Sequence, residues 1–130
     1  MRIFRMKKLV RDKIVDNLLK TGAKKINSKI LDDKQFFKEL KNKLQEEIDE
    51  LKEVDYRDIK NLTNELSDIQ LLINYLSKTL NISVKNLDKM QKEKAIKVGN
   101  FDKRIFVDTV VFRDNSKWIK YFEKSYEEVK

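Results

Sequence analysis

The sequence predicts an all-α protein: a bundle of four helices, with a short extended segment and a C-terminal helix appended. The chain of 130 residues has no Pro and only two Gly, Gly22 and Gly99. An average chain of this length would have roughly six Pro and nine Gly, so turn-rich all-β folds are disfavoured. Apolar residues also recur at helical spacing along most of the chain. We expect residues 1–112 to form one domain, with residues 113–130 as a C-terminal helical extension of it.

The predicted elements have recognisable boundaries. Gly22 ends the first helix, because Gly tolerates the left-handed conformation of a helix C-cap, and Asp32 or Asp33 caps the second helix. The run RIFVDTVVF, residues 104–112, is rich in β-branched and aromatic residues and predicts an extended strand. Residues 115–116 can cap a last amphipathic helix. The four main helices are expected at about residues 7–20, 33–54, 58–80 and 84–97.

The composition narrows the possible chemistry. The chain has no Cys and no His, which excludes disulfides, zinc–thiolate and His–zinc sites, thiol nucleophiles and Ser-His-Asp catalysis. Catalysis would have to use carboxylates, Lys, Arg, Tyr or hydroxyl groups, and a bound metal would be a hard ion such as Mg²⁺ or Mn²⁺. No run of about 18 apolar residues predicts a membrane span, and the start lacks the apolar run of a signal peptide. We therefore expect a cytoplasmic protein without membrane contact.

The charge is unevenly spread along the chain. The sequence has 30 Lys and Arg against 22 Asp and Glu, a net charge of +8. Residues 46–68 contain nine acids and three bases, so this window carries −6 and the rest of the chain +14. Two interpretations stay open: a cation site surrounded by anion-binding Lys and Arg, or ordinary solvated helix faces.

Four acids of this window fall on or beside apolar helix faces when residues are placed at about 100° intervals. Glu47 lies inside the apolar stripe of its helix and Glu50 at its margin, and Glu65 and Asp68 repeat this arrangement on the next helix. A connection of about five residues predicts an antiparallel hairpin that brings the four carboxylates together. A divalent cation would offset their repulsion; the alternative is pairing with buried Lys or Arg. Glu46, beside the stripe, could orient or deprotonate a water, or be an ordinary surface residue.

These residues resemble a known family. EEIDE at 46–50, followed by ELSD at 65–68, resembles the E-E-x-x-E…E-x-x-D signature of the MazG-like all-α nucleoside triphosphate pyrophosphohydrolases. Three further motifs resemble a small phosphoribosyl-ATP pyrophosphohydrolase-like subgroup of that superfamily, so the resemblance covers about residues 6–107. These motifs are KLVRDKI at 8–14, ILDD at 30–33 and GNFDKRIFV at 99–107.

The resemblance implies a fold, an assembly and an activity. It implies a helical bundle, usually a homodimer or a dimer of dimers, that uses Mg²⁺ as its cofactor. The implied reaction hydrolyses a nucleoside triphosphate between the α and β phosphates, giving the monophosphate and pyrophosphate. We expect the substrate to be a non-standard or damaged nucleotide, removed in a house-cleaning role.

The resemblance also implies roles for individual residues. Glu46 matches the leading Glu of the signature, and we expect Glu46 and Glu47 to be catalytic. Lys97 or Arg104 would replace a family Arg in the segment around Val98. The metal ligands implied are Glu47, Glu50, Glu65 and Asp68. The basic residues implied near the phosphates are Lys8, Arg11, Lys13 and Lys94.

Other functions remain open at this point. One alternative keeps the reaction but acts on phosphoribosyl-ATP in histidine biosynthesis. A second is a nucleic-acid-binding protein, suggested by the net charge of +8, although acids inside an apolar stripe contribute nothing to phosphate-backbone binding. A third is a non-catalytic regulator with the same bundle.

The apolar side of helix 7–20 is broader than one core face needs, so we expect at least a homodimer.

Overall fold

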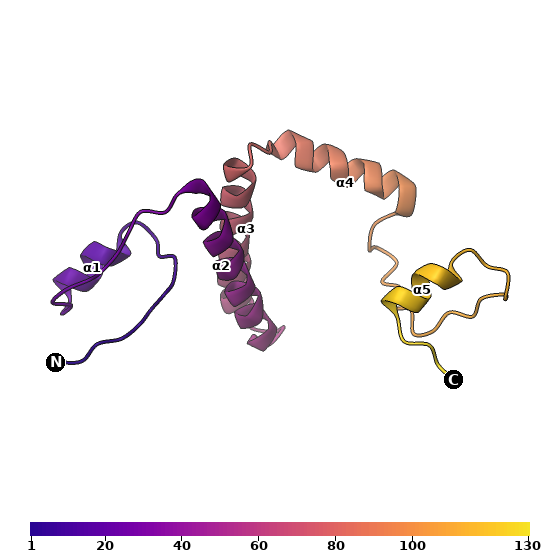
Figure 1. Cartoon of the computed structure of the whole chain (residues 1–130), viewed down its shortest axis with the longest axis horizontal. Helices are drawn as coiled ribbons and strands as arrows, with labels where there is room; N and C mark the ends of the chain where they lie inside the picture. The colour runs from indigo at the N-terminus through magenta and orange to yellow at the C-terminus, as the bar shows by residue number, and fades with distance from the viewer. The chain divides into compact units, whose positions relative to one another are not determined.

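The computed structural model describes residues 1–130 and contains five helices and no strand (Figure 1). The prediction of an all-α protein is therefore confirmed. The chain divides into two units, residues 1–92 and residues 93–130. No helix has both the length and the apolar character needed to cross a bilayer. The helices are α1 (Ile14–Lys20), α2 (Asp33–Glu53), α3 (Ile59–Thr79), α4 (Val84–Val98) and α5 (Ile119–Ser125).

The two long helices of the first unit, α2 and α3, pack together as an antiparallel hairpin (Figure 1). Each is preceded by an Asp whose side chain accepts a hydrogen bond from a backbone N–H in the first turn. Asp32 accepts from Gln35 at 2.8 Å, and Asp58 accepts from Asn61 at 3.2 Å. Such caps satisfy N–H groups that a helix otherwise leaves unpaired. The boundaries predicted for both helices are met to within one residue.

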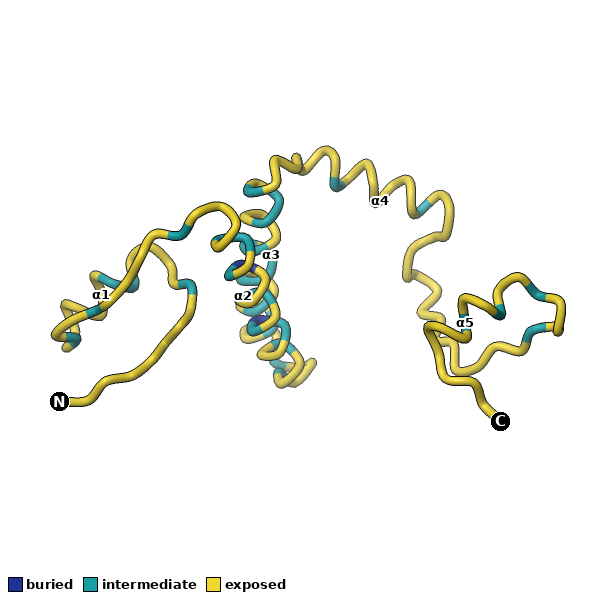
Figure 2. Tube along the Cα trace, in the orientation of Figure 1, coloured by how far each residue is buried: buried dark blue, intermediate teal, exposed yellow.

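Burial in this unit is concentrated along the hairpin (Figure 2). Leu40 of α2 is the one fully buried apolar side chain, with 1% of its surface exposed. No other pair of helices packs extensively, so the four-helix bundle stays a prediction. The apolar residues that are half-buried along the hairpin include Leu44, Ile48, Leu51, Leu62, Ile69 and Leu72.

The first helix is shorter than predicted. It spans Ile14–Lys20, whereas the sequence suggested residues 7–20. Lys7 has a φ of 46°, in the left-handed region that residues other than Gly rarely adopt, so no helix begins there, and residues 8–13 form irregular chain and a turn. The segment before α1 instead carries the side chains of Lys8 and Arg11 to the hairpin, where both form ion pairs.

In the second unit, the end of α4 agrees with the prediction but the strand does not form. Gly99 follows α4 with a φ of 81° and donates its N–H to the carbonyl of Ala95 at 2.9 Å. Residues 104–112 contain no strand, so that prediction is wrong. A strand requires a neighbour with which to exchange backbone hydrogen bonds, and this unit offers none.

The last helix is also shorter than expected. α5 ends at Ser125 because the backbone of Tyr126 is extended, with a φ of −138°. The ring of Phe122 lies at the centre of an aromatic cluster, 4.7 Å from the ring of Phe112 and 4.7 Å from that of Tyr126. Contacts between aromatic rings at such distances hold the preceding segment against α5.

Candidate metal centre

The α2–α3 hairpin brings three of the predicted metal ligands together. Glu47 comes from α2, and Glu65 and Asp68 come from α3, one helical turn apart. Each offers a carboxylate oxygen, and these oxygens all lie within 4.8 Å of one another. We call these three residues the acid cluster. It forms because Glu47 and Glu65 lie on the apolar sides through which the two helices pack.

Two oxygens of the acid cluster are buried and have no partner. Glu47 is buried, with 8% of its surface exposed, and Glu65 is half-buried. The Oε2 atoms of Glu47 and Glu65 accept no hydrogen bond. Leaving a buried polar atom unsatisfied costs about 1–3 kcal/mol, and more for a charged group. Because a hard divalent cation prefers carboxylate oxygens and neutralises several of them at once, the residues present fit Mg²⁺ or Mn²⁺.

The pKa of Glu47 is also shifted by this environment. Burial raises the pKa of Glu47 to about 7, and the carboxylates of Glu65, Glu50 and Asp68 add to the rise. A low-dielectric environment and neighbouring negative charges both disfavour the ionised form. Glu47 is therefore held between the charged and neutral forms near neutral pH, the state that an added cation would resolve.

Glu50 lies at the edge of this arrangement. It is exposed and is not part of the acid cluster, although its carboxylate is close enough to raise the pKa of Glu47. The structure thus brings three of the four predicted ligands into one group and leaves the fourth beside it.

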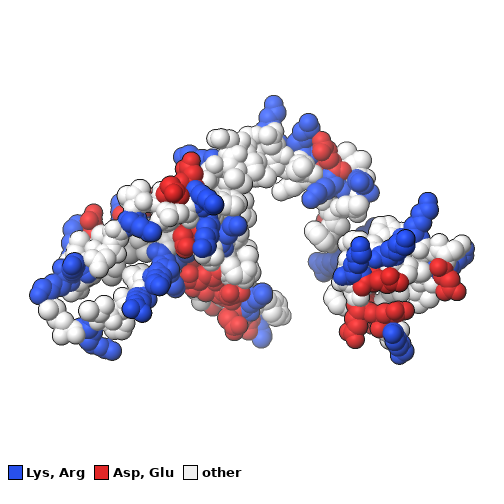
Figure 3. All heavy atoms as spheres, in the orientation of Figure 1, with Lys and Arg blue, Asp and Glu red and all other residues white.

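Two cations from the N-terminal segment form ion pairs with the carboxylates of Glu46 and Asp68. Lys8 Nζ donates to Glu46 Oε1 at 2.8 Å, and Arg11 Nη2 donates to Asp68 Oδ1 at 2.8 Å. Lys43 lies 3.7 Å from the same Glu46 oxygen. This hydrogen bond from Lys8 to Glu46 lowers the pKa of Glu46 and raises the pKa of Lys8. In Figure 3, Lys and Arg side chains border the acidic side chains that gather on the hairpin.

These contacts divide the acids into two kinds. Glu46 and Asp68 have cationic partners, but Lys8 and Arg11 are exposed, so these ion pairs are not the pairing with buried Lys or Arg that the sequence left open. The inner oxygens of Glu47 and Glu65 have none. Pairing with Lys or Arg therefore leaves the buried oxygens of Glu47 and Glu65 unexplained.

The remaining predicted bases are not part of this cluster of contacts. Lys13 is exposed at the start of α1 and forms no ion pair. Lys94 and Lys97 belong to α4 and Arg104 to the segment after it, all within the second unit. Their role near a substrate stays a prediction.

Sequence reasoning missed one feature beside Glu46. Glu39, Asn42 and Lys43 share its face of α2 and line a groove together with residues 6–9. Their spacing from Glu46, at three, four and seven residues, was the available signal. They do not belong to the acidic motif, and the conformation of residues 6–9 could not be read from the sequence.

Comparisons with protein-family models, with curated proteins and with solved structures found no match to this chain. The family resemblance therefore rests on the motifs in the sequence, and the chemistry of the site rests on the acid cluster.

Proposed function

We propose that this protein hydrolyses a nucleoside triphosphate between its α and β phosphates, giving a nucleoside monophosphate and pyrophosphate, with Mg²⁺ as cofactor. The observation that carries the proposal is the acid cluster: three carboxylates within 4.8 Å, two of them with a buried oxygen that lacks a partner. The motif resemblance supports the choice of reaction. It also supports a house-cleaning role on a non-standard or damaged nucleotide.

The acids would share the work of binding the ion. Glu47, Glu65 and Asp68 would hold Mg²⁺, with Glu50 at the edge of the site. Bound there, the ion would neutralise phosphate charge and lower the pKa of a water. Glu46, which also lies 3.7 Å from Lys43, would accept a hydrogen bond from the attacking water and orient it.

Lys8 and Arg11 would bind the phosphates. Their side chains are 49% and 64% exposed, so they can turn from the carboxylates to a ligand without losing a buried contact. Arg offers two parallel N–H groups to a phosphate, and Lys a compact positive charge. Because both already lie beside Glu46 and Asp68, a triphosphate bound at the acid cluster would meet them directly.

We propose that a homodimer is the smallest functional assembly. An exposed apolar seam runs along α3 at seven-residue spacing and continues to its C-cap. Seven-residue spacing places side chains on one face of a helix, as in coiled coils. The seam consists of Ile59, Leu66, Ile73 and Leu80, which are 67%, 55%, 37% and 50% exposed.

Product analysis tests the proposed reaction. Standard and damaged nucleoside triphosphates would be incubated with the full chain and Mg²⁺, and the products separated by ion-exchange chromatography. We expect a monophosphate and pyrophosphate in equal amounts from at least one substrate. A nucleoside diphosphate with orthophosphate, or no turnover of any triphosphate, would contradict the proposal.

A further inference from the structure

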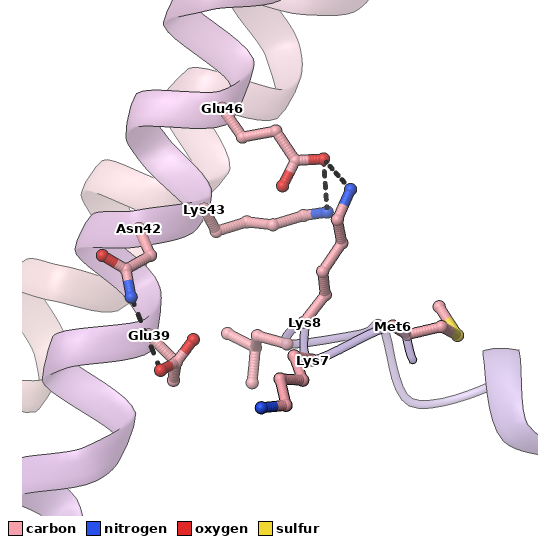
Figure 4. Close-up of a pocket in the computed structure, with 8 residues that line it drawn as sticks. Met6, Lys7, Lys8, Glu39, Asn42, Lys43 and Glu46 are labelled. Atoms are coloured by element: carbon pink, nitrogen blue, oxygen red, sulfur yellow. Dashed lines mark hydrogen bonds and ion pairs between the residues drawn. The ribbon is translucent and has the colours of Figure 1, made fainter. Parts of the chain in front are cut away.

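A groove lies between the N-terminal segment and one face of α2, next to Glu46 (Figure 4). Its volume is about 380 Å³, within the range of about 300–1,000 Å³ that small-molecule sites occupy. Residues 6–9 form one wall, and Glu39, Asn42, Lys43 and Glu46 form the other.

The wall on α2 ends at Glu46, which lies beside the acid cluster in the sequence but is not part of it. Glu39, Asn42, Lys43 and Glu46 follow one another at helical spacing, so their side chains share one face. The rise from Glu39 to Glu46 is about 10 Å, a length over which a nucleoside extends. Lys8 links the groove to the acid cluster, because it lines the groove and its pKa is raised by the hydrogen bond to Glu46 and also by the charges of Glu50 and Glu47. A ligand whose phosphates lie at the acid cluster would therefore direct its other end along this groove.

The opposite wall is held in an unusual backbone conformation. Lys7 has a φ of 46°, and such conformations cost about 1–3 kcal/mol and concentrate at functional sites. This wall presents both apolar and charged groups: Leu9 is half-buried, and Met6 and Lys7 are exposed.

The chemistry of the lining favours a base over a second phosphate. The lining contains three Lys and two Glu side chains. Glu46 already forms ion pairs with Lys8 at 2.8 Å and Lys43 at 3.7 Å. An inorganic anion would meet both carboxylates. Glu39 instead offers a carboxylate that accepts hydrogen bonds, and Asn42 offers a side-chain amide. The hydrogen bond that Asn42 donates to Glu39 is long, at 3.5 Å. Carboxylates and amides recognise the amino and ring N–H groups of bases.

We propose that this groove holds the nucleoside part of the nucleotide, with Glu39 accepting hydrogen bonds from an amino-bearing base and Asn42 contacting the same ring. The inference rests on the proposed function and names the ligand chemistry that the site selects. The apolar part of Leu9 would cover one face of the ring.

Binding of nucleoside monophosphates tests the groove without any need for turnover. Guanosine and inosine monophosphates differ only in the 2-amino group of the base. Each would be titrated into the full chain in millimolar Mg²⁺, and the binding measured by calorimetry. We expect guanosine monophosphate to bind about tenfold more tightly, the size of one hydrogen bond. Glu39→Gln should reduce that preference, and Asn42→Leu should weaken both ligands.

Exposed residues of the hairpin provide matched controls. Glu53→Gln and Asn64→Leu lie outside the groove and should leave both affinities unchanged. Thermal melts would confirm that each variant is folded. Equal affinity for the two bases, no binding of either, or wild-type affinities in the folded Glu39 and Asn42 variants would overturn the assignment.

The same variants separate this inference from the proposed function. Monophosphate binding that depends on Glu39, without pyrophosphate release from any triphosphate, would retain the groove and remove the reaction. Pyrophosphate release with an unchanged KM in Glu39→Gln and Asn42→Leu would retain the reaction and remove the groove.

Discussion

The buried carboxyl of Glu47 makes the stability of the metal-free protein depend on pH in a way that one substitution should remove. Burial and the nearby acids raise the pKa of Glu47 from 4.5 to about 7 in the folded protein. In the unfolded chain the carboxyl of Glu47 has a pKa near its ordinary value. Between these two values the folded protein binds a proton that the unfolded chain has released.

The sign and size of the effect follow from this difference. Because the folded state binds more protons, the free energy of unfolding falls as the pH rises through this interval. The total loss is about 3 kcal/mol, and it is complete once the pH passes the folded pKa. The chain has no His, so few other side chains titrate between pH 5 and 8. Glu47→Gln, which is neutral at every pH, should remove this part of the slope.

Urea denaturation at fixed protein concentration in EDTA would measure the slope. Wild type and Glu53→Gln should both lose stability between pH 5 and 8, and Glu47→Gln should not. At pH 8 the Glu47 variant should be the more stable by about 2–3 kcal/mol. The same slope in wild type and Glu47→Gln, or a less stable Glu47 variant at pH 8, would refute the reasoning.

Three further predictions concern the ion, the reaction and the assembly. Thermal melts should show Mg²⁺ stabilising the wild type by about 2.7 kcal/mol at a hundred times its Kd, an effect that Glu65→Gln loses and Glu53→Gln keeps; a full Mg²⁺ effect in Glu65→Gln would count against the site. Asp68→Asn should lower kcat by at least ~100-fold, and near-normal turnover would place the ion on other carboxylates. Light scattering should give twice the mass of one chain for the wild type and a monomer for Leu66→Glu, whereas a monomeric wild type would exclude the proposed dimer.

The hairpin was predictable because its signals are local. The period of the apolar residues sets the phase of each helix, and Asp32 and Asp58 supply caps within one turn of the residues they serve. The phase then fixes that Glu47 and Glu65 face the neighbouring helix. No knowledge of the rest of the chain was needed.

The elements predicted wrongly depend on contacts that sequence patterns do not encode. The apolar stripe before α1 suggested a longer helix, but Lys8 and Arg11 pair with Glu46 and Asp68, 38 and 57 residues away. The run at 104–112 has strand propensity, yet no second strand exists to complete it. β propensity describes how side chains fit a sheet, and it cannot create the sheet.

The candidate site, like the fold, could be predicted from the sequence only in part. The sequence predicted which acids would meet, since they repeat on two helices joined by a short turn. It placed both Glu50 and Asp68 at the margins of their stripes, and it did not show that Asp68 would join the acid cluster and Glu50 would not, because that depends on how the two helices pack. The groove beside Glu39 was missed because its second wall is irregular backbone.

The central claim is that the acid cluster binds the ion that cleaves the α–β phosphate bond. The most direct test is pyrophosphate release as a function of Mg²⁺ concentration, measured in parallel for wild type, Glu65→Gln and Glu53→Gln on the best substrate. We predict saturable, Mg²⁺-dependent release in wild type and Glu53→Gln, with loss of at least ~100-fold in Glu65→Gln. Release that is independent of Mg²⁺, or equal in all three proteins, would contradict the account.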